Sequence, residues 1–207
     1  DSWGGVDAAP IIEREWARLA GATFTGKNTM SIMPARSSFF FLAVLFLPFS
    51  VAQPQMKGDH CGRCSKCLSN CPTDAFLAPY VLDARRCISY WTIEAKGLPP
   101  KPLRSAFGDW IFGCDDCQEV CPHNHRPEPS EEDDFLPRHA WLDLGDLVRS
   151  QDDVLMERFI GTPLRRAKAS GLKRNALLAL ANAADPAAVP IALEALRSHH
   201  ATVRAAA

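Results

Sequence analysis

The segment Cys61-Gly-Arg-Cys-Ser-Lys-Cys-Leu-Ser-Asn-Cys-Pro72 decides how this chain folds. A second run, Cys114-Asp-Asp-Cys-Gln-Glu-Val-Cys-Pro122, repeats its ending, in which a cysteine, three other residues and Cys-Pro follow one another. Cysteines at these spacings are the ligand runs of bacterial four-iron ferredoxins. Together with Cys87, the two runs contain all 8 cysteines of the chain. The sequence therefore predicts two [4Fe–4S] clusters and a protein that transfers electrons one at a time.

The division of the ligands between the clusters follows from one missing cysteine. In ferredoxin runs the first three thiolates bind one cluster and the fourth binds the other. The second run lacks its first ligand, because Ile111 stands three residues before Cys114. Cys87 fills this gap and leaves no cysteine over. The first ligand set is then Cys61, Cys64, Cys67 and Cys121, and the second is Cys71, Cys87, Cys114 and Cys117.

Other uses of the cysteines explain the pattern less well. Zinc takes four ligands, but a zinc site does not require the Cys-Pro ending that occurs twice here. Disulfides belong to oxidising compartments and leave the tight spacings unexplained. A cluster with a purely structural role stays open. His123 and His125 follow the second run and could tune a cluster, although we expect them at the surface.

Composition and length place few limits on function. The 207 residues are 47% hydrophobic, and 23 basic and 24 acidic side chains give a net charge of −1. This is an ordinary soluble composition that neither favours nor excludes a nucleic-acid partner. The chain begins at Asp1 and ends within a repeat, so we interpret it as a fragment. The acidic run Glu131–Asp134 is typical of a solvated linker, and 53–60 is a second polar linker.

The first 52 residues contain short elements. Residues 10–20 predict a helix that Gly21 ends, and Gly26–Thr29 predicts a turn before a strand at 30–33. The apolar stretch Phe39–Phe49 is too short to cross a bilayer as a helix, which takes about 20 residues. We expect it to be a buried strand. A secretory signal is the alternative, because small residues at 50–52 resemble a cleavage site.

The C-terminal part contains an internal repeat. Lys173-Arg-Asn-Ala176 recurs 30 residues later as Val203-Arg-Ala-Ala206. The spacing predicts one helix pair of a HEAT-like solenoid and the first turn of the next. The basic residues at its start could form a patch for RNA phosphates, whose binding depends on salt; the alternative is a solvated helix face. The proposed patch comprises Arg165, Arg166, Lys168, Lys173 and Arg174.

Several segments resemble the epoxyqueuosine reductase family. They are Leu82-Asp-Ala-Arg-Arg-Cys-Ile-Ser-Tyr90, Gly113-Cys-Asp-Asp-Cys117, Asp7-Ala-Ala-Pro10, Gly26-Lys-Asn-Thr29 and Lys173-Arg-Asn-Ala-Leu177. The resemblance covers nearly the whole chain and implies an α+β fragment of three parts. Residues 1–52 would be the end of a cobalamin-binding α/β catalytic domain. Residues 53–128 would be a ferredoxin-like double-cluster module, and 129–207 a linker and a truncated α-helical HEAT-like tail.

The resemblance also implies a reaction, the reduction of epoxyqueuosine to queuosine in tRNA, with electrons passing through the clusters to cobalamin. Removal of the epoxide oxygen as water takes two electrons and two protons. The general acid would be Asp7, whose pKa an apolar setting should raise; the alternative role of Asp7 is a helix N-cap. The residues implied near the corrin or the substrate are Lys27, Asn28, Ser89, Asp115 and Asp116. Their ordinary roles would be a turn, a capping serine and solvated acids.

The family further implies the partners. These are the anticodon region of tRNA and a reductant protein such as flavodoxin or ferredoxin. We expect a cytoplasmic monomer without a membrane segment. Two other functions stay open at this point: another cobalamin and iron–sulfur reductase related to reductive dehalogenases, and a ferredoxin-like carrier that only passes electrons.

Overall fold

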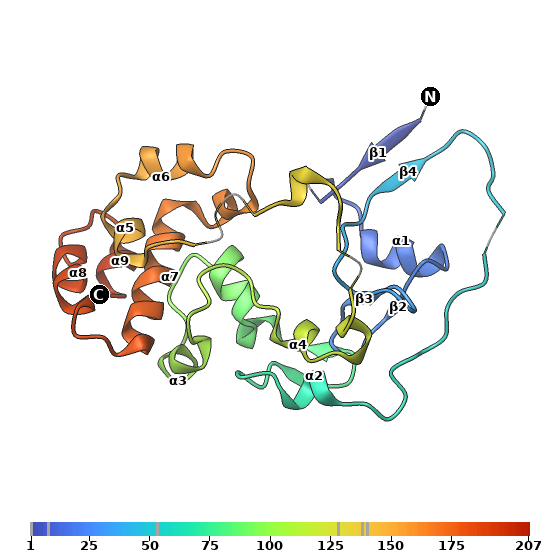
Figure 1. Ribbon diagram of the computed structural model, residues 1–207, viewed down its shortest axis with the longest axis horizontal. Helices are drawn as coiled ribbons and strands as arrows, with labels where there is room; N and C mark the ends of the chain where they lie inside the picture. The colour runs from blue at the N-terminus through green and yellow to red at the C-terminus, as the bar shows by residue number, and fades with distance from the viewer. Residues whose placement is uncertain (1, 8, 53, 128, 138, 140) are drawn as a thin grey trace. The chain divides into compact units, whose positions relative to one another are not determined.

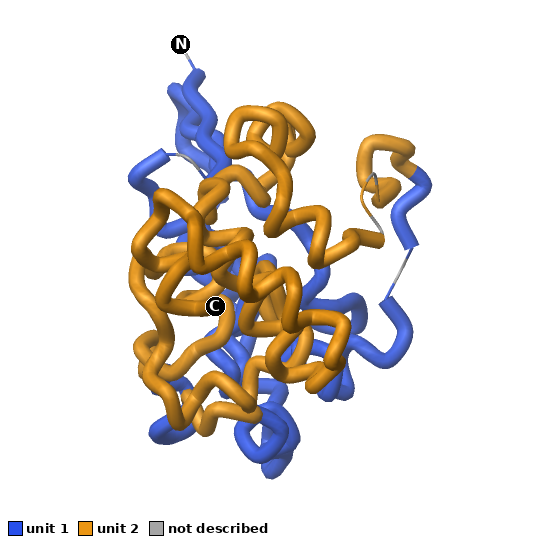
Figure 2. Tube along the Cα trace, turned by 90° about the vertical axis from the view of Figure 1, so that its left-hand side faces the viewer, with its two compact units in different colours: residues 1–71, 76–82, 115–131 blue, residues 72–75, 83–114, 132–207 orange. Residues whose placement is uncertain are grey.

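The computed structural model describes residues 2–7, 9–52, 54–127, 129–137, 139 and 141–207. Ala8 of the Asp7–Pro10 motif and Gln53 of the first linker lie outside these ranges. The chain forms two compact units, each made of three stretches of sequence (Figure 2). Unit 1 comprises residues 1–71, 76–82 and 115–131, and unit 2 comprises residues 72–75, 83–114 and 132–207. The fold mixes helix and sheet, as the sequence predicts.

Unit 1 contains short elements only. Its described strands pair into three antiparallel two-stranded sheets, β1 with β4, β2 with β3 and β5 with β6. The elements are β1 (Trp3–Gly5), α1 (Glu13–Leu19), β2 (Phe24–Thr25), β3 (Ser31–Ile32), β4 (Val44–Phe46), α2 (Lys66–Ser69), β5 (Phe76–Ala78), β6 (Val81–Leu82), α4 (Asp116–Glu119) and the short helix η4 (Pro122–Asn124). Loops therefore carry most of its backbone, including the cysteine runs.

The predicted turn at residues 26–29 joins β2 to β3. The Gly26 N–H donates to the Met30 carbonyl at 2.8 Å and closes the hairpin. A Cβ atom at Gly26 would lie 2.6 Å from both Asn28 Oδ1 and Ile32 Cδ1, which is closer than real Cβ atoms approach. Glycine is therefore required there, and its close packing fixes the hairpin tip that carries Lys27 and Asn28.

The expectation of a buried strand at Phe39–Phe49 is wrong. Only Val44–Phe46 forms a strand, β4, and Phe41 is 82% exposed. Among the described strands, β4 pairs only with β1, and most residues of this stretch are exposed. Its Phe46 ring contacts Trp3 and Trp16 with ring centroids 5.6 and 5.9 Å apart.

The predicted helix at residues 10–20 is present as α1, Glu13–Leu19. Ala17 is the residue that α1 buries, whereas Ile12 and Trp16 are exposed. Across the described ranges, the helices are too short or too polar to span a bilayer.

Unit 2 is mainly helical. Helices α5, α6, α8 and α9 surround α7 (Figure 1). The core between them includes Leu147, Leu155, Phe159, Leu172 and Val203, each at most 1% exposed. The elements are η1 (Ala84–Arg86), η2 (Tyr90–Glu94), α3 (Lys101–Arg104), η3 (Ser105–Phe107), η5 (Asp133–Phe135), α5 (Leu144–Arg149), α6 (Asp152–Arg158), η6 (Pro163–Ala167), α7 (Lys168–Ala183), α8 (Ala188–Ala195) and α9 (Ala201–Arg204).

The repeat has the predicted local structure. Helix α7 ends at Ala183, its C-cap Ala184 has a left-handed φ of 53°, and Pro186 follows before α8 and α9. The linker at 131–134 is exposed, also as predicted.

The prediction of a five-residue basic surface patch is wrong for two of its residues. Lys173 and Arg174 are only 7% and 1% exposed, because they lie on the face of α7 that packs inside unit 2. Lys173 forms an ion pair with Asp152 at 2.6 Å, and Arg174 donates to backbone carbonyls. Arg165, Arg166 and Lys168 are exposed as predicted.

Candidate metal centre

The four cysteines of the first ligand set line one cavity in unit 1. Its volume is ≈140 Å³. Cys61 and Cys64 lie on the loop that leads into α2, Cys67 lies within α2, and Cys121 follows α4 and is 8% exposed. The other lining residues are Lys27, Asn28, Ile32, His60, Pro122 and His123. The structure thus brings together thiols that are up to 60 residues apart in sequence.

The electrostatics of this cavity suit a cationic group. Burial raises the pKa of the Cys67 thiol, and the neighbouring Cys61, Cys121 and Cys64 raise it further. Burial likewise raises the pKa of Cys61, and the neighbouring Asp59 and Cys121 raise it further. Thiolates held this close repel one another unless a metal neutralises them, and metal ligation requires the thiolate form. The cavity and its donor set therefore fit an iron–sulfur cluster.

The hairpin tip fastens the backbone of the cysteine loops. Lys27 Nζ donates to the Gly62 and Cys64 carbonyls at 2.6 and 2.9 Å. Asn28 is buried and its Nδ2 donates to the Cys117 carbonyl at 3.1 Å. The cavity that Lys27 and Asn28 line is smaller than the roughly 300–1,000 Å³ typical of pockets for larger organic ligands. In the structure, Lys27 and Asn28 contact the backbone of the two cysteine runs.

Asp59 fixes the start of the first cysteine run and was missed in the sequence. Its Oδ1 accepts the Cys61 N–H at 2.7 Å, and its Oδ2 accepts the Tyr80 hydroxyl at 2.8 Å. The Cys61 hydrogen bond lowers the pKa of Asp59, whereas burial beside this carboxylate raises the pKa of Tyr80 to about 12. An aspartate two residues before a turn is a recognisable signal for such a bond, but we assigned it to a polar linker.

A buried polar network holds the second run. Ser38 N–H donates to Asn124 Oδ1 at 2.7 Å, and Asn124 Nδ2 donates to the Gln118 carbonyl at 2.8 Å. Gln118 Nε2 in turn donates to Asp115 Oδ1 at 2.6 Å. Asp115 is thus an acceptor at the start of α4, and Asp116 is the first residue of that helix, where acids are favourable.

The two histidines after the second run differ in their exposure. His123 lines the cavity and its ring lies 5.3 Å from the Phe24 ring, so the expectation that it lies at the surface is wrong. His125 is exposed, as expected.

The second ligand set draws on both units. Cys71 and Cys117 belong to unit 1, and Cys87 and Cys114 to unit 2. Cys87 directly follows η1, which Asp83 caps by accepting the Arg85 N–H at 3.0 Å. At the vacant ligand position, Ile111 packs against the core of unit 2, so an apolar side chain has a structural role there.

Helix α7 holds the segments of unit 2 that carry Cys87 and Cys114. Arg174 donates to the carbonyls of Trp91, Ala95 and Gly97 at 2.6 to 2.7 Å. Burial lowers its pKa to about 10, so the guanidinium stays charged at neutral pH. These bonds satisfy three carbonyls at the end of η2, shortly after Cys87.

Asn175 connects the same two segments. Its Nδ2 donates to the Thr92 and Ile111 carbonyls, each at 2.8 Å. Thr92 Oγ1 accepts the Gly113 N–H at 3.0 Å and approaches the Ser89 carbonyl at 3.3 Å. Ser89 is therefore half-buried beside this network. In the sequence, Arg174 and Asn175 belong to the repeat and to a motif of the resembled family, and Arg174 also to the proposed basic patch; none of these indicates the role found here.

Asp7 lies away from any helix cap. Helix α1 begins at Glu13 with Ile12 in the cap position, so the N-cap reading is wrong. The Asp7 side chain is exposed, in contrast to the apolar setting that we expected. Its φ of 47° is left-handed, a conformation that aspartate tolerates better than most residues.

Comparison with known proteins agrees with the cysteine pattern. Residues 60–124 match the model of the 4Fe-4S double cluster binding domain. An epoxyqueuosine reductase of Pseudomonas aeruginosa is 46% identical over 196 residues, which cover 93% of this chain and 54% of that protein. The chain therefore spans about half the length of the curated relatives it matches.

Two solved structures share the fold. A crystal structure of epoxyqueuosine reductase with a tRNA-Tyr epoxyqueuosine-modified stem loop has a TM-score of 0.92 and 32% identity, and the match covers 100% of this chain and 56% of that one. A Bacillus subtilis epoxyqueuosine reductase, with its aspartate-bearing catalytic loop swung out of the active site, has a TM-score of 0.87 and 30% identity over 100% and 56% of the two chains.

Proposed function

Because this chain belongs to the epoxyqueuosine reductase family, we propose that it is part of an enzyme that reduces epoxyqueuosine in tRNA to queuosine. The observation that carries the proposal is the cavity lined by Cys61, Cys64, Cys67 and Cys121, within a region that matches a double-cluster domain. Its thiols suit a four-iron cluster and therefore single-electron transfer.

The proposed organisation has three parts. Residues 1–52 end a cobalamin-binding domain, residues 53–128 form the double-cluster module, and residues 129–207 form a linker and a HEAT-like tail. The helix pair α7 and α8 and the recurring basic motif support the last assignment. The matched region at residues 60–124 supports the second.

The cysteines divide as the spacing predicts. In this proposal Cys71, Cys87, Cys114 and Cys117 bind the second cluster, and a reductant protein such as flavodoxin or ferredoxin supplies electrons. Bound cobalamin would supply the strongly reducing carrier that opens the epoxide. Lys27 and Asn28 hold the cluster loops, while Ser89, Asp115 and Asp116 lie beside the other ligand segments.

Asp7 would donate the proton to the departing epoxide oxygen. Its exposure and left-handed backbone suit a loop that closes over substrate, where burial would then raise its pKa. The Bacillus subtilis structure, described as having a catalytic loop with an aspartate that swings, supports such a movement.

The anticodon region of tRNA would be the substrate, as the stem-loop complex of a relative supports. Arg165, Arg166 and Lys168 remain as exposed candidates for phosphate contacts. Substitution of all three by alanine should weaken tRNA binding and flatten its salt dependence, while cluster content stays the same. Unchanged binding with the same salt slope would exclude this patch. The enzyme is proposed to be a cytoplasmic monomer.

The test uses purified protein with reconstituted clusters, cobalamin, a low-potential reductant and an epoxyqueuosine-modified stem loop. Mass spectrometry should show loss of one oxygen atom from the modified base. Asp7→Asn should keep both clusters and lose most of this activity, because an amide cannot supply the proton. A protein with both clusters that passes electrons but never reduces the epoxide would instead be a ferredoxin-like carrier.

A further inference from the structure

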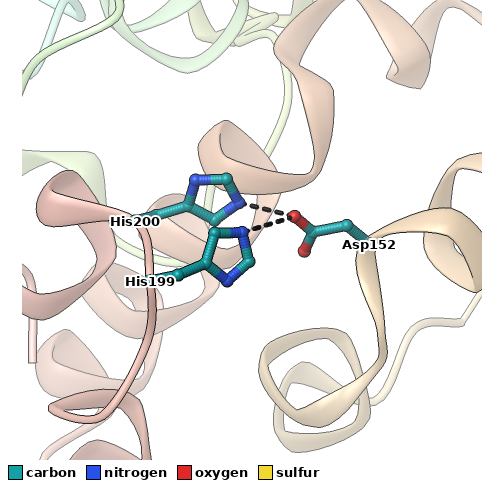
Figure 3. A group of neighbouring side chains, drawn as sticks. All are labelled: Asp152, His199 and His200. Carbon is teal, nitrogen blue, oxygen red and sulfur yellow. Dashed lines mark hydrogen bonds and ion pairs between the residues drawn. The ribbon is translucent and has the colours of Figure 1, made fainter.

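Asp152, His199 and His200 converge in unit 2, far in sequence from every cysteine (Figure 3). Asp152 begins α6, and the two histidines precede α9. His199 Nε2 and His200 Nε2 lie 3.2 and 2.6 Å from the same carboxylate oxygen, Asp152 Oδ2. One ligand-type atom from each residue lies within 4.8 Å of the others. We propose that these three side chains form a binding site for a divalent transition metal ion, with zinc as the expected occupant.

The donor chemistry suits this class of metal. Two imidazoles and one carboxylate are the protein ligands of many zinc sites, which keep a further position for water. Zinc ligand atoms at about 2.0–2.2 Å from the metal lie roughly 3.3–3.5 Å from one another in a tetrahedron. The His199 distance is close to this value, and His200 must move back from Asp152 by less than about 1 Å. Histidine binds a metal ion as the neutral imidazole, through Nε2 when its proton is on Nδ1.

The surroundings fix the ligands before metal binds. Lys173 Nζ donates to the other carboxylate oxygen, Asp152 Oδ1, at 2.6 Å. Arg204 donates to the Ser198 and His199 carbonyls at 2.7 and 3.1 Å, which holds the histidine loop. Such outer hydrogen bonds orient ligands in established metal sites.

Access and charge are compatible with an ion. Asp152 and His199 line a cavity of ≈730 Å³, which can admit a metal and its water. Its cationic lining residues, Arg149, Lys173 and Arg197, are balanced by Asp152, Asp153 and Glu194. Arg149 is paired with Glu194 at 2.7 Å and Lys173 with Asp152.

The test adds zinc chloride to protein whose iron–sulfur clusters are intact, so that the cysteines are occupied. Wild type should retain about one zinc ion per chain after dialysis and melt at a higher temperature with zinc than without it. His199→Ala should lower the zinc affinity at least about tenfold, and His199→Ala with His200→Ala should abolish uptake. Asp153→Asn is the matched control, because Asp153 is a carboxylate of the same cavity that is not one of the three proposed zinc ligands.

Iron content and far-ultraviolet circular dichroism of each variant separate lost binding from lost folding. His199 is 74% exposed, so its single substitution leaves the core intact and keeps the test valid if the double variant fails to fold. Retention of zinc in His199→Ala equal to that of wild type would overturn the proposal. Absence of zinc uptake by wild type would also overturn it. Asp152, His199 and His200 would then only join the start of α6 to the loop before α9 through their polar contacts.

Discussion

The two predicted ligand sets differ in what supports them. The first set, Cys61, Cys64, Cys67 and Cys121, lies within unit 1 and lines one cavity beside the β2–β3 hairpin. The second set takes Cys87 and Cys114 from segments that α7 holds through Arg174 and Asn175. The two sets have similar cysteine spacing, but the β2–β3 hairpin holds the first. Helix α7 holds the second, from about 60 to 90 residues further along the chain than Cys114 and Cys87. Asn28 of the hairpin also donates to the Cys117 carbonyl of the second set, so the contacts from α7 are what the second set has in addition. The difference teaches that segments with the same ligand pattern can depend on different structural contacts.

Removal of one ligand from each set should have the largest effect. Cys87→Ser and Cys121→Ser should each lower the iron content from about eight to about four per chain, because each cluster loses one of four thiolates. Electron paramagnetic resonance of the reduced protein should show that a different cluster survives in each variant. Two intact clusters in Cys87→Ser, or loss of the same signal in both variants, would show that the assignment of ligands is wrong.

Asn175→Ala should have the next largest effect. It leaves the carbonyls of Thr92 and Ile111 without their buried donor, and we expect the free energy of unfolding to fall by about 2–4 kcal/mol. The signal of the second cluster should weaken while that of the first persists.

Asn182→Ala is the matched control for this change. Asn182 also lies on α7 and donates to two carbonyls, those of Arg104 and Gly108, each at 2.9 Å. These carbonyls are outside the cysteine segments, so this variant should lose stability without losing either cluster. Equal cluster loss in both variants would mean that general stability, rather than the α7 contact, governs the second set.

Lys27→Met should affect the first set more mildly. The lysine is only half-buried, so loss of its bonds to the Gly62 and Cys64 carbonyls should cost about 1–2 kcal/mol. We expect roughly a tenfold faster loss of the first cluster on exposure to a chelator. Arg14→Met is the control, because it removes a hydrogen bond that Arg14 donates to the Thr29 carbonyl of the same hairpin. It should leave the rate of cluster loss unchanged. Equal rates of cluster loss in Lys27→Met and wild type would exclude the proposal that the hairpin holds the loops of the first cluster.

The sequence predicted features whose causes are local. Cysteine spacing identified the residues that line the cavity, and glycine with polar residues identified the turn at 26–29. The break at Asp185–Pro186 separated α7 from α8. These predictions succeeded because turn chemistry and short ligand spacing act over a few residues.

Features that depend on distant partners could not be predicted in this way. Arg174 lies in a basic run that suggests a surface, yet three backbone carbonyls of η2 and its surroundings compensate its burial. Phe39–Phe49 is apolar enough for a core, but most of its residues are exposed in the structure. Ser38, Gln118 and Asn124 form a buried network across about 80 residues of sequence without any motif. In each case the missing information is which other segment packs there.

Two glycines allow the smallest and most direct comparison. Gly62 and Gly113 adjoin the first and second ligand sets, with φ angles of 50° and 75°. A Cβ atom at either position would meet no atom within 4 Å, so substitution by alanine strains the backbone and creates no clash. The expected loss is about 1–2 kcal/mol for a left-handed alanine.

Gly62→Ala should therefore speed loss of the first cluster alone, and Gly113→Ala that of the second alone. Gly161→Ala is the control, since Gly161 has a φ of 75° and open space but adjoins no cysteine. It should lose similar stability and keep both clusters as in wild type. Chelator-driven bleaching, followed separately for each cluster by electron paramagnetic resonance, measures these rates. If either glycine variant destabilises both clusters equally, the two sets share one support, because strain placed beside one set then reaches the other.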